Sequence, residues 1–216
     1  MCGRFALNAT AEELEEHFGL CVPEVYVARY NIAPGSPLLV ITEQSLTFFK
    51  WGLVPGWMRD IRPGRQMINA RAETVCDKPS FKSAFKRRRC LIPASGFYEW
   101  KSGPGYKQPY YGTLRQPLFS FAGIWEHWQD GQGNELQTCA ILTTQATGEM
   151  ALIHPRMPVV IRPDNYSNWL DHRNEEVNKA QECIAELTDE WNFYAVSSAV
   201  NSANNDYKEL IDPMVK

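Results

Sequence analysis

The sequence predicts an α+β fold in which a curled, mostly antiparallel β-sheet or barrel-like core carries peripheral helices. Two observations support this prediction. Many short apolar segments alternate with turn residues, and only a few stretches show the helical period of hydrophobic residues. At 216 residues the chain is long enough to bury a substantial core. It has no internal repeat, low-complexity tract or linker, so we expect one domain over residues 1–216.

The N-terminal segment predicts a short strand followed by a capped helix. Phe5–Leu7 is apolar and follows the first four residues directly, so we expect it to fix them inside the fold. Thr10 and Glu13 have the spacing of a capping box, in which each side chain bonds a backbone N–H of the first turn. Gly19 stands where a helix commonly ends in a left-handed residue.

Short apolar segments predict the strands of the sheet. They cover residues 38–42, 46–51, 90–94, 110–114, 118–125, 136–144, 159–161 and 191–197. Gly96–Trp100 continues into a hairpin through Gly103-Pro104-Gly105, and Asp130-Gly131 predicts a second tight turn.

Three further segments predict peripheral helices, and a proline-bounded loop is expected at residues 153–158. The first helix is expected to start at Pro79, because proline is favoured at the first helical position. The apolar faces of the three helices are Phe81, Ala84 and Phe85; Tyr166, Trp169 and Leu170; and Val177, Ala180, Ile184 and Leu187.

Charge and cysteine usage limit the classes of function. The formal net charge of −3 gives no overall attraction to nucleic acid, so any such site must be a local basic patch. The six cysteines are scattered, without a C-x-x-C pair or a histidine at ligand spacing, which argues against a structural zinc site. The chemistry expected below implies no metal or organic cofactor. No stretch approaches the roughly 18 apolar residues of a membrane span. We expect a cytoplasmic protein with reduced thiols and no membrane partner.

The opening Met1-Cys2-Gly3-Arg4 offers an unusual nucleophile. If Met1 is removed, Cys2 carries a thiol and a free α-amine on adjacent carbons. Their reference pKa values are about 8.5 and about 7.7–8.0, so both are partly nucleophilic near neutral pH. The amine can form a Schiff base with an aldehyde, and the thiol can then close a thiazolidine ring. The alternative is that Cys2 is a small buried hydrophobe, as most cysteines without a disulfide are.

Three other polar residues in apolar surroundings are candidates for proton transfer and positioning. Glu99 lies between Tyr98 and Trp100, and a carboxylate in such surroundings can exchange protons near neutrality. His154 is in a rigid loop, and imidazole titrates in the range that a proton shuttle needs. Asn69 can orient an amine or a sugar oxygen. The alternatives are a solvent-facing Glu99, a structural His154 and an Asn69 that braces a turn.

Basic and aromatic residues form a candidate single-stranded DNA surface. The basic residues that can contact phosphates are Arg4, Arg71, Lys78, Arg87 and Arg88. Trp51 and Trp57 can stack on bases, each stacked base contributing about 1–3 kcal/mol. We expect these tryptophans to be hard to bury, because their segment is rich in Pro and Gly. The alternative for Arg87, Arg88 and their neighbours is a solvated helix end.

Seven motifs in a fixed order carry a resemblance to a known family. They are Met1-Cys2-Gly3-Arg4, Tyr30-Asn31-Ile32-Ala33-Pro34, Trp51-Gly52-Leu53-Val54-Pro55, Asn69-Ala70-Arg71-x-Glu73-Thr74, Arg89-Cys90-Leu91-Ile92-Pro93-Ala94-x-Gly96-Phe97-Tyr98-Glu99-Trp100, Phe121-Ala122-Gly123-Ile124-Trp125 and Ile153-His154-x-Arg156-Met157-Pro158. Over nearly its whole length the chain resembles the SOS response-associated peptidase (SRAP) family.

The resemblance implies a protein that binds single-stranded DNA and crosslinks to abasic sites in it. Cys2 would be the nucleophile after self-processing removes Met1, with Asn69 positioning it and Glu99 and His154 moving protons. Arg4 and Arg71 fall at phosphate-contact positions. Trp57 and Met58 fall where the family wedges beside the damaged nucleotide, although Met58 replaces a second aromatic. Lys78 and Thr143 match more loosely. The expected DNA contacts are Arg4, Pro34, Trp51, Trp57, Met58, Arg71, Lys78, Thr143 and Arg156.

Two other functions compete with this expectation. One is a cysteine peptidase that acts on other proteins through Cys2. Weak lyase activity through a Schiff base would instead belong to the abasic-site function. The other is a non-covalent single-stranded DNA-binding module in which Cys2 is idle. We expect a monomer that works beside replication or repair proteins, associated with the nucleoid if the source is bacterial.

Overall fold

A computed structural model describes residues 2–43, 45–59, 66–172, 177–185 and 191–214. The predictions that concern Met1 and Leu187 therefore lie outside the described residues. Among the helices described, none is long and apolar enough to cross a membrane.

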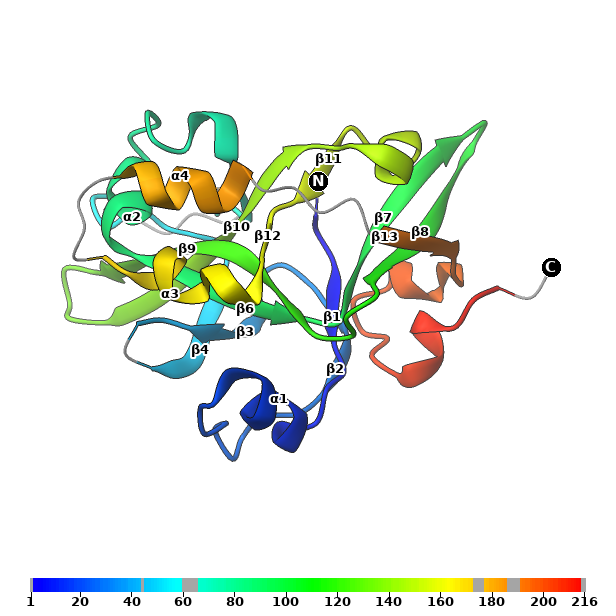
Figure 1. Cartoon of the computed structure of the whole chain (residues 1–216), viewed down its shortest axis with the longest axis horizontal. Helices are drawn as coiled ribbons and strands as arrows, with labels where there is room; N and C mark the ends of the chain where they lie inside the picture. The colour runs from blue at the N-terminus through cyan, green and yellow to red at the C-terminus, as the bar shows by residue number, and fades with distance from the viewer. Residues whose placement is uncertain (1, 44, 60–65, 173–176, 186–190, 215–216) are drawn as a thin grey trace.

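A closed five-stranded barrel forms the larger part of the fold (Figure 1). Its strands pair in the ring β3–β4–β10–β9–β6 and back to β3. The β4–β10 pair is parallel, and the other four pairs are antiparallel. Closure leaves these strands without an open edge. The bounds are β3 Pro37–Ile41, β4 Leu46–Trp51, β6 Arg89–Ala94, β9 Phe119–Gln129 and β10 Glu135–Gln145.

Three short strands extend the barrel sheet on β10 and β9. The strand β5 (Asn69–Arg71) pairs in parallel with β10, and β11 (Arg156–Pro158) pairs with the same strand in antiparallel orientation. The strand β12 (Val160–Ile161) pairs with β9. The prediction of a loop over residues 153–158 is wrong for its second half. Three residues ending in a proline are too short to show a period of two.

A second, antiparallel sheet has the order β13–β8–β7–β1–β2. The bounds are β1 Phe5–Leu7, β2 Arg29–Ile32, β7 Gly96–Gly103, β8 Tyr106–Leu114 and β13 Trp191–Ala195. In Figure 1, β1 runs between the barrel and the hairpin of β7 and β8. The two sheets share a core, since the Phe5 ring lies edge-on to Trp51 at 5.3 Å and to Phe121 at 5.7 Å. The predicted α+β class with a barrel-like core is confirmed.

The helices lie on the outside, as predicted (Figure 1). They are α1 Ala11–Phe18, α2 Lys82–Arg87, α3 Tyr166–Leu170 and α4 Val177–Ala185. Thr10 and Glu13 form the predicted capping box of α1, and Gly19 ends it at φ 65°. The predicted start of α2 at Pro79 is wrong. Pro79 lies in a turn in which Phe81 donates its backbone N–H to the Lys78 carbonyl, and the helix begins only at Lys82, whose N–H donates to the same carbonyl.

Five 3-10 helices complete the described elements. They are η1 Ala72–Thr74, η2 Gly148–Leu152, η3 Pro163–Asn165, η4 Ser198–Asn201 and η5 Lys208–Ile211. The first follows β5 directly, the second precedes His154, and η4 supplies Asn201 to a pocket beside Glu99. These elements therefore place side chains around the beginning of β1.

Candidate active site

Cys2 is completely buried just before β1. Its carbonyl oxygen accepts a hydrogen bond of 2.8 Å from Nδ2 of Asn69. Burial raises the pKa of the Cys2 thiol strongly, and the nearby Glu99 carboxylate raises it further, while the Arg4 backbone N–H lowers it only in part. The thiol is therefore protonated at neutral pH, and it needs a base before its sulfur can attack.

Asn69 is the first residue of β5 and is fixed by the barrel. The parallel pairing of β5 with β10 sets Asn69 opposite Ile141. Its Nδ2 donates a hydrogen bond to the Cys2 carbonyl, and its buried Oδ1 accepts no hydrogen bond from the described residues. A buried amide oxygen is costly to leave unsatisfied, so Oδ1 is suited to accept from an amine or a sugar hydroxyl.

Glu99 comes from the second sheet and has 3% of its surface exposed. It sits opposite Tyr110 in the pairing of β7 with β8. Its Oε1 lies 3.8 Å from Nδ1 of His154. Because Tyr98 donates its backbone N–H to the Arg4 carbonyl, the beginning of the chain runs directly beside this part of β7. The barrel side of the site thus carries Asn69, and the hairpin side carries Glu99.

His154 follows η2 and is held by the backbone of Arg156. Its Nδ1 lies 3.0 Å from both the amide nitrogen and the carbonyl oxygen of Arg156. A neutral ring with bare Nδ1 can accept from the N–H, and a ring protonated there can donate to the carbonyl. The ring can therefore change its protonation state without turning, which suits a proton shuttle.

A pocket of about 550 Å³ opens onto Glu99 and His154. Its other lining residues are Trp100, Ser102, Lys107 and Asn201. Cys2 does not line this pocket, so its sulfur lies behind the wall that Glu99 and His154 form. The structure thus brings together the four predicted catalytic residues, which come from four separate motifs.

Two of the expected DNA-contact residues are buried, and both predictions need correction. Trp51 has no exposed surface; its ring packs on Phe5, and its Nε1 donates to the Ile68 carbonyl at 2.9 Å. The strand β4 ends at Trp51, so its ring enters the barrel core instead of the following loop. Thr143 is also completely buried, within β10 between β5 and β11. Neither side chain reaches a surface on which a nucleotide could lie.

Two of the expected DNA contacts are arginines whose guanidinium groups bind other parts of the protein. The guanidinium of Arg4 donates to Oδ1 of Asn31 at 2.7 Å and to the carbonyls of Val200 and Asn201. Arg156 binds both carboxylate oxygens of Glu73, at 2.6 and 2.9 Å, and the Thr143 carbonyl at 2.5 Å. A phosphate would have to compete with these internal partners.

The remaining expected contacts lie at or near the surface. Trp57 is 66% exposed, and Pro34, Arg71 and Lys78 are exposed as well, whereas Met58 is half-buried. The loop that carries Trp57 is fastened to the barrel. Trp128 donates its Nε1 hydrogen to the Met58 carbonyl at 2.6 Å. The backbone next to the exposed Trp57 ring is therefore held in place.

Sequence reasoning missed Glu73 and Asn31 as organising residues. Besides Arg156, Glu73 accepts from Thr144 Oγ1 and the Gln145 N–H, and so joins β5, β10 and β11 around the site. The Arg156 guanidinium lowers the pKa of Glu73 to about 2. Asn31 is completely buried, and its Nδ2 donates to the carbonyls of Val200, Ser202 and Asn205. Both residues stand in the quoted motifs. For Asn31 the available signal was a polar residue beside apolar Ile32 and Ala33, whereas Glu73 stands in a motif that is itself mostly polar.

The comparison with protein families decides the family. A family model described as SOS response associated peptidase (SRAP) matches residues 1–203. The chain belongs to this family. Its resemblance to SRAP proteins, predicted from seven motifs, is thus confirmed.

Curated relatives agree with the SRAP assignment. The chain is 40% identical to "Abasic site processing protein YoqW" of Bacillus subtilis over 222 residues, covering 98% of this chain and 99% of that protein. It is 33% identical to "Abasic site processing protein YedK" of Escherichia coli, covering 99% and 100%. With "Abasic site processing protein HMCES" of Gallus gallus it shares 32% identity over 80% of this chain and 59% of that one.

Solved structures show the same SRAP fold. A crystal structure of a Bacteroides thetaiotaomicron protein superposes with a TM-score of 0.88 at 24% identity, over 99% of this chain and all of that chain. A phage-related protein of Bordetella bronchiseptica gives a TM-score of 0.72 at 32% identity, over 90% and 94%.

Proposed function

We propose that this SRAP protein binds single-stranded DNA and crosslinks covalently to abasic sites through Cys2, after Met1 has been removed. One observation carries the proposal. Cys2, Asn69, Glu99 and His154 converge behind a pocket large enough for an abasic sugar. The names of three relatives, each called an abasic site processing protein, support the substrate.

The reaction joins an aldehyde carbon to both nucleophiles of the N-terminal cysteine. The α-amine nitrogen bonds to C1′ of the ring-opened sugar, and the aldehyde oxygen leaves as water, giving an imine. The Cys2 sulfur then adds to the imine carbon while the thiol proton passes to nitrogen. The five-membered thiazolidine forms with net release of one water molecule. A ring of this kind resists hydrolysis better than the imine alone.

Each of the four residues has a role that follows from its position. Asn69 holds the Cys2 backbone through Nδ2 and offers Oδ1 to the incoming amine or sugar. Glu99 faces the buried thiol and can take its proton. His154, 3.8 Å from Glu99, can pass protons to and from the pocket. General acid–base help of this kind contributes roughly 10²–10⁴-fold to a rate.

Removal of Met1 by the protein itself is part of the proposal. The new α-amine would be on Cα of Cys2, next to the Cβ that carries the thiol. Glu99 and His154 are close enough to the thiol and to each other to move the protons of this hydrolysis. No observation favours a peptidase that acts on other proteins. The non-covalent alternative differs from the proposed function in one respect: the protein binds single-stranded DNA but forms no covalent bond to it.

A denaturing gel distinguishes these functions. The protein is mixed with single-stranded DNA that carries one abasic site, denatured and separated. We expect a shifted band that survives denaturation and is lost in Cys2→Ala. Cys21→Ala is the matched control, because Cys21 is an exposed cysteine after α1 and is not one of the four site residues, and it should keep the band. Binding in a native gel without the denaturation-resistant band would favour the non-covalent module.

A further inference from the structure

The pocket at Glu99 and His154 extends along the β7–β8 hairpin to residues that the proposed reaction does not use. Its outer wall contains Trp100, Ser102 and Lys107, and we call these three residues the hairpin subsite. Ser102 and Lys107 are paired directly across the two strands, so both side chains leave the same face of the sheet. The Lys107 side chain is exposed. The far end of the pocket therefore presents an ammonium group and a hydroxyl.

The backbone edge of β7 adds further donors. β1 pairs with β7 only at Gly96 and Phe97, and the last bond between the two segments runs from the Tyr98 N–H to the Arg4 carbonyl. Beyond Tyr98, no strand among the described residues pairs with this edge. Backbone groups alternate between the two edges of a strand, so the N–H groups of Trp100 and Ser102 point to the same side as that of Tyr98. Trp100 and Ser102 both line the pocket, so these N–H groups lie at its border.

Trp100 is fixed in place to form the wall. Its Nε1 donates to Oδ1 of Asn201 at 2.7 Å, which links β7 to η4. Arg4 holds the same 3-10 helix through the carbonyls of Val200 and Asn201. The Trp100 ring is therefore held against η4, which Arg4 fixes in turn.

We propose that the hairpin subsite binds a phosphodiester of the DNA strand next to the abasic sugar. This inference rests on the proposed function, which puts the sugar at Glu99 and His154. Ser102 lies three residues beyond Glu99, or about 10 Å along the strand. A lysine ammonium, a serine hydroxyl and backbone N–H groups are the donors that proteins use for DNA phosphates. A strand that leaves the site in this direction meets all three.

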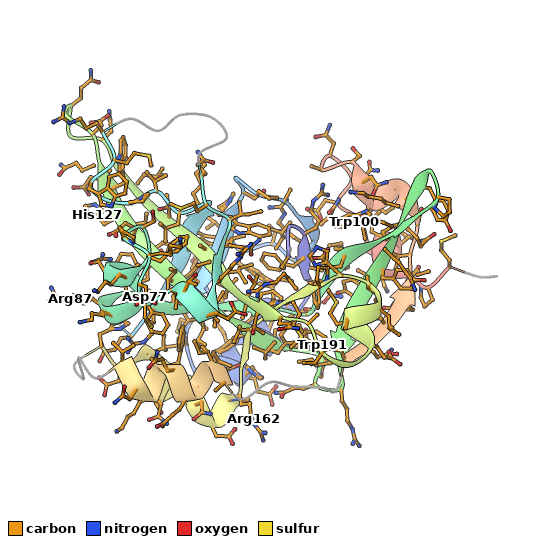
Figure 2. The ribbon with its side chains drawn as sticks, turned by 90° about the horizontal axis from the view of Figure 1, so that it is seen from above. Asp77, Arg87, Trp100, His127, Arg162 and Trp191 are labelled. Carbon is orange, nitrogen blue, oxygen red and sulfur yellow. The ribbon has the colours of Figure 1, made fainter. Side chains whose placement is uncertain are left out.

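The subsite lies on the opposite side of the site from Trp57. Figure 2 shows Trp100 on the hairpin side and His127 at the other end of the molecule. The Trp57 loop belongs to the His127 end, because Trp128 donates to the Met58 carbonyl and a Cβ added at Gly56 would lie only 3.1 Å from the His127 carbonyl oxygen. The bound strand would thus be held on both flanks of the lesion, by the Trp57 loop and by the hairpin subsite.

The test compares Lys107→Gln with Lys101→Gln. Lys101 is the matched control, because it is exposed on the same hairpin but lines a different pocket, beside Tyr106 and Tyr110. Crosslinking is measured against the concentration of abasic single-stranded DNA. For Lys107→Gln we expect the half-maximal concentration to rise about two- to fivefold, as for one exposed ion pair. The rate at saturating DNA should not change, and Lys101→Gln should match the unsubstituted protein.

Two shortened DNA strands make the assignment directional. In one strand the abasic nucleotide is the 5′ end, so no nucleotide precedes it. In the other strand it is the 3′ end, so no nucleotide follows it. The Lys107→Gln effect should disappear with one of them, because that strand lacks the phosphate in question, and persist with the other. Equal behaviour of the two lysine variants on full-length DNA, or an effect that persists with both short strands, would overturn the subsite. A lack of crosslinking by the unsubstituted protein would instead refute the proposed function.

Discussion

The floor of the site and the surface expected to hold DNA were predicted from the same motifs, yet they differ in the structure. The floor consists of Cys2, Asn69, Glu99 and His154, and all four lie together. The rim consists of the nine expected DNA contacts. Two of these are buried, two arginines bind other parts of the protein, and the rest lie at or near the surface. The motifs thus predicted which residues lie together better than they predicted which residues lie on the surface.

The largest effect is expected on the floor, from Glu99→Gln. The substitution keeps the size of a side chain that is 3% exposed but removes the base beside the Cys2 thiol. Crosslinking should slow by about 10²-fold or more, whereas affinity for undamaged single strands should be kept. Rates from quenched time courses and affinities from fluorescence anisotropy measure the two separately. If Glu99→Gln lost both together, Glu99 would be structural.

The two tryptophans of the predicted rim should separate stability from binding. Trp51→Ala removes a fully buried ring and should lower the free energy of unfolding by about 3–5 kcal/mol. Trp57→Ala, at a 66% exposed position, should leave unfolding nearly unchanged and weaken DNA binding by about 1–3 kcal/mol. Urea titration and anisotropy on the same samples give both numbers. A stable Trp51→Ala protein with weakened binding would reverse our assignment.

Substitutions of Arg71 and Arg156 should likewise separate DNA binding from stability, with smaller effects than those of the tryptophans. Arg71 is exposed, so Arg71→Ala should weaken binding about fivefold and reduce the salt slope for single strands by about 0.7. Arg156→Ala leaves Glu73 without its bidentate partner and should mainly lower stability. Binding measured from about 50 to 200 mM salt checks both variants. An unchanged slope in Arg71→Ala would remove this residue from the rim.

The smallest expected effect is the response of the Glu73–Arg156 pair to acid. The pKa of Glu73 falls from 4.5 to about 2 in the folded protein, so its stabilisation is present above about pH 4.5 and is lost as the pH falls toward 2. Because the Glu73 side chain is 45% exposed, solvent screening limits the effect to about 1 kcal/mol or less. Urea midpoints at pH 7 and pH 3 should converge for the unsubstituted protein and Glu73→Gln as the pH falls. A constant difference would contradict this role.

Local patterns were sufficient to predict most of the elements. Thr10, Glu13 and Gly19 specify α1 through contacts within a few residues, and the hairpin at Pro104-Gly105 was equally local. The closure of the barrel was not local. It depends on the parallel pairing of β4 with β10, two strands that are separated by more than 80 residues. The start of α2 also failed, because Pro79 suits a turn as well as a first helical position.

The grouping of the four floor residues was predictable because the proposed chemistry requires particular atoms. An aminothiol, a base and a proton carrier have few substitutes among the side chains. Arginine and tryptophan, in contrast, serve a protein interior as readily as they serve DNA. Arg4 and Arg156 satisfy buried carbonyls and a carboxylate, and Trp51 fills the barrel. Which of these uses applies is settled by tertiary packing, which a sequence motif does not contain.

The intact mass of the protein–DNA adduct tests the central claim most directly. The protein is incubated with a defined abasic oligonucleotide, and the adduct is weighed without reduction. We predict the mass of the chain without Met1 plus that of the oligonucleotide, less one water, with peptide mapping placing the bond on Cys2. An adduct that retains Met1, or a bond at any other residue, would contradict the account.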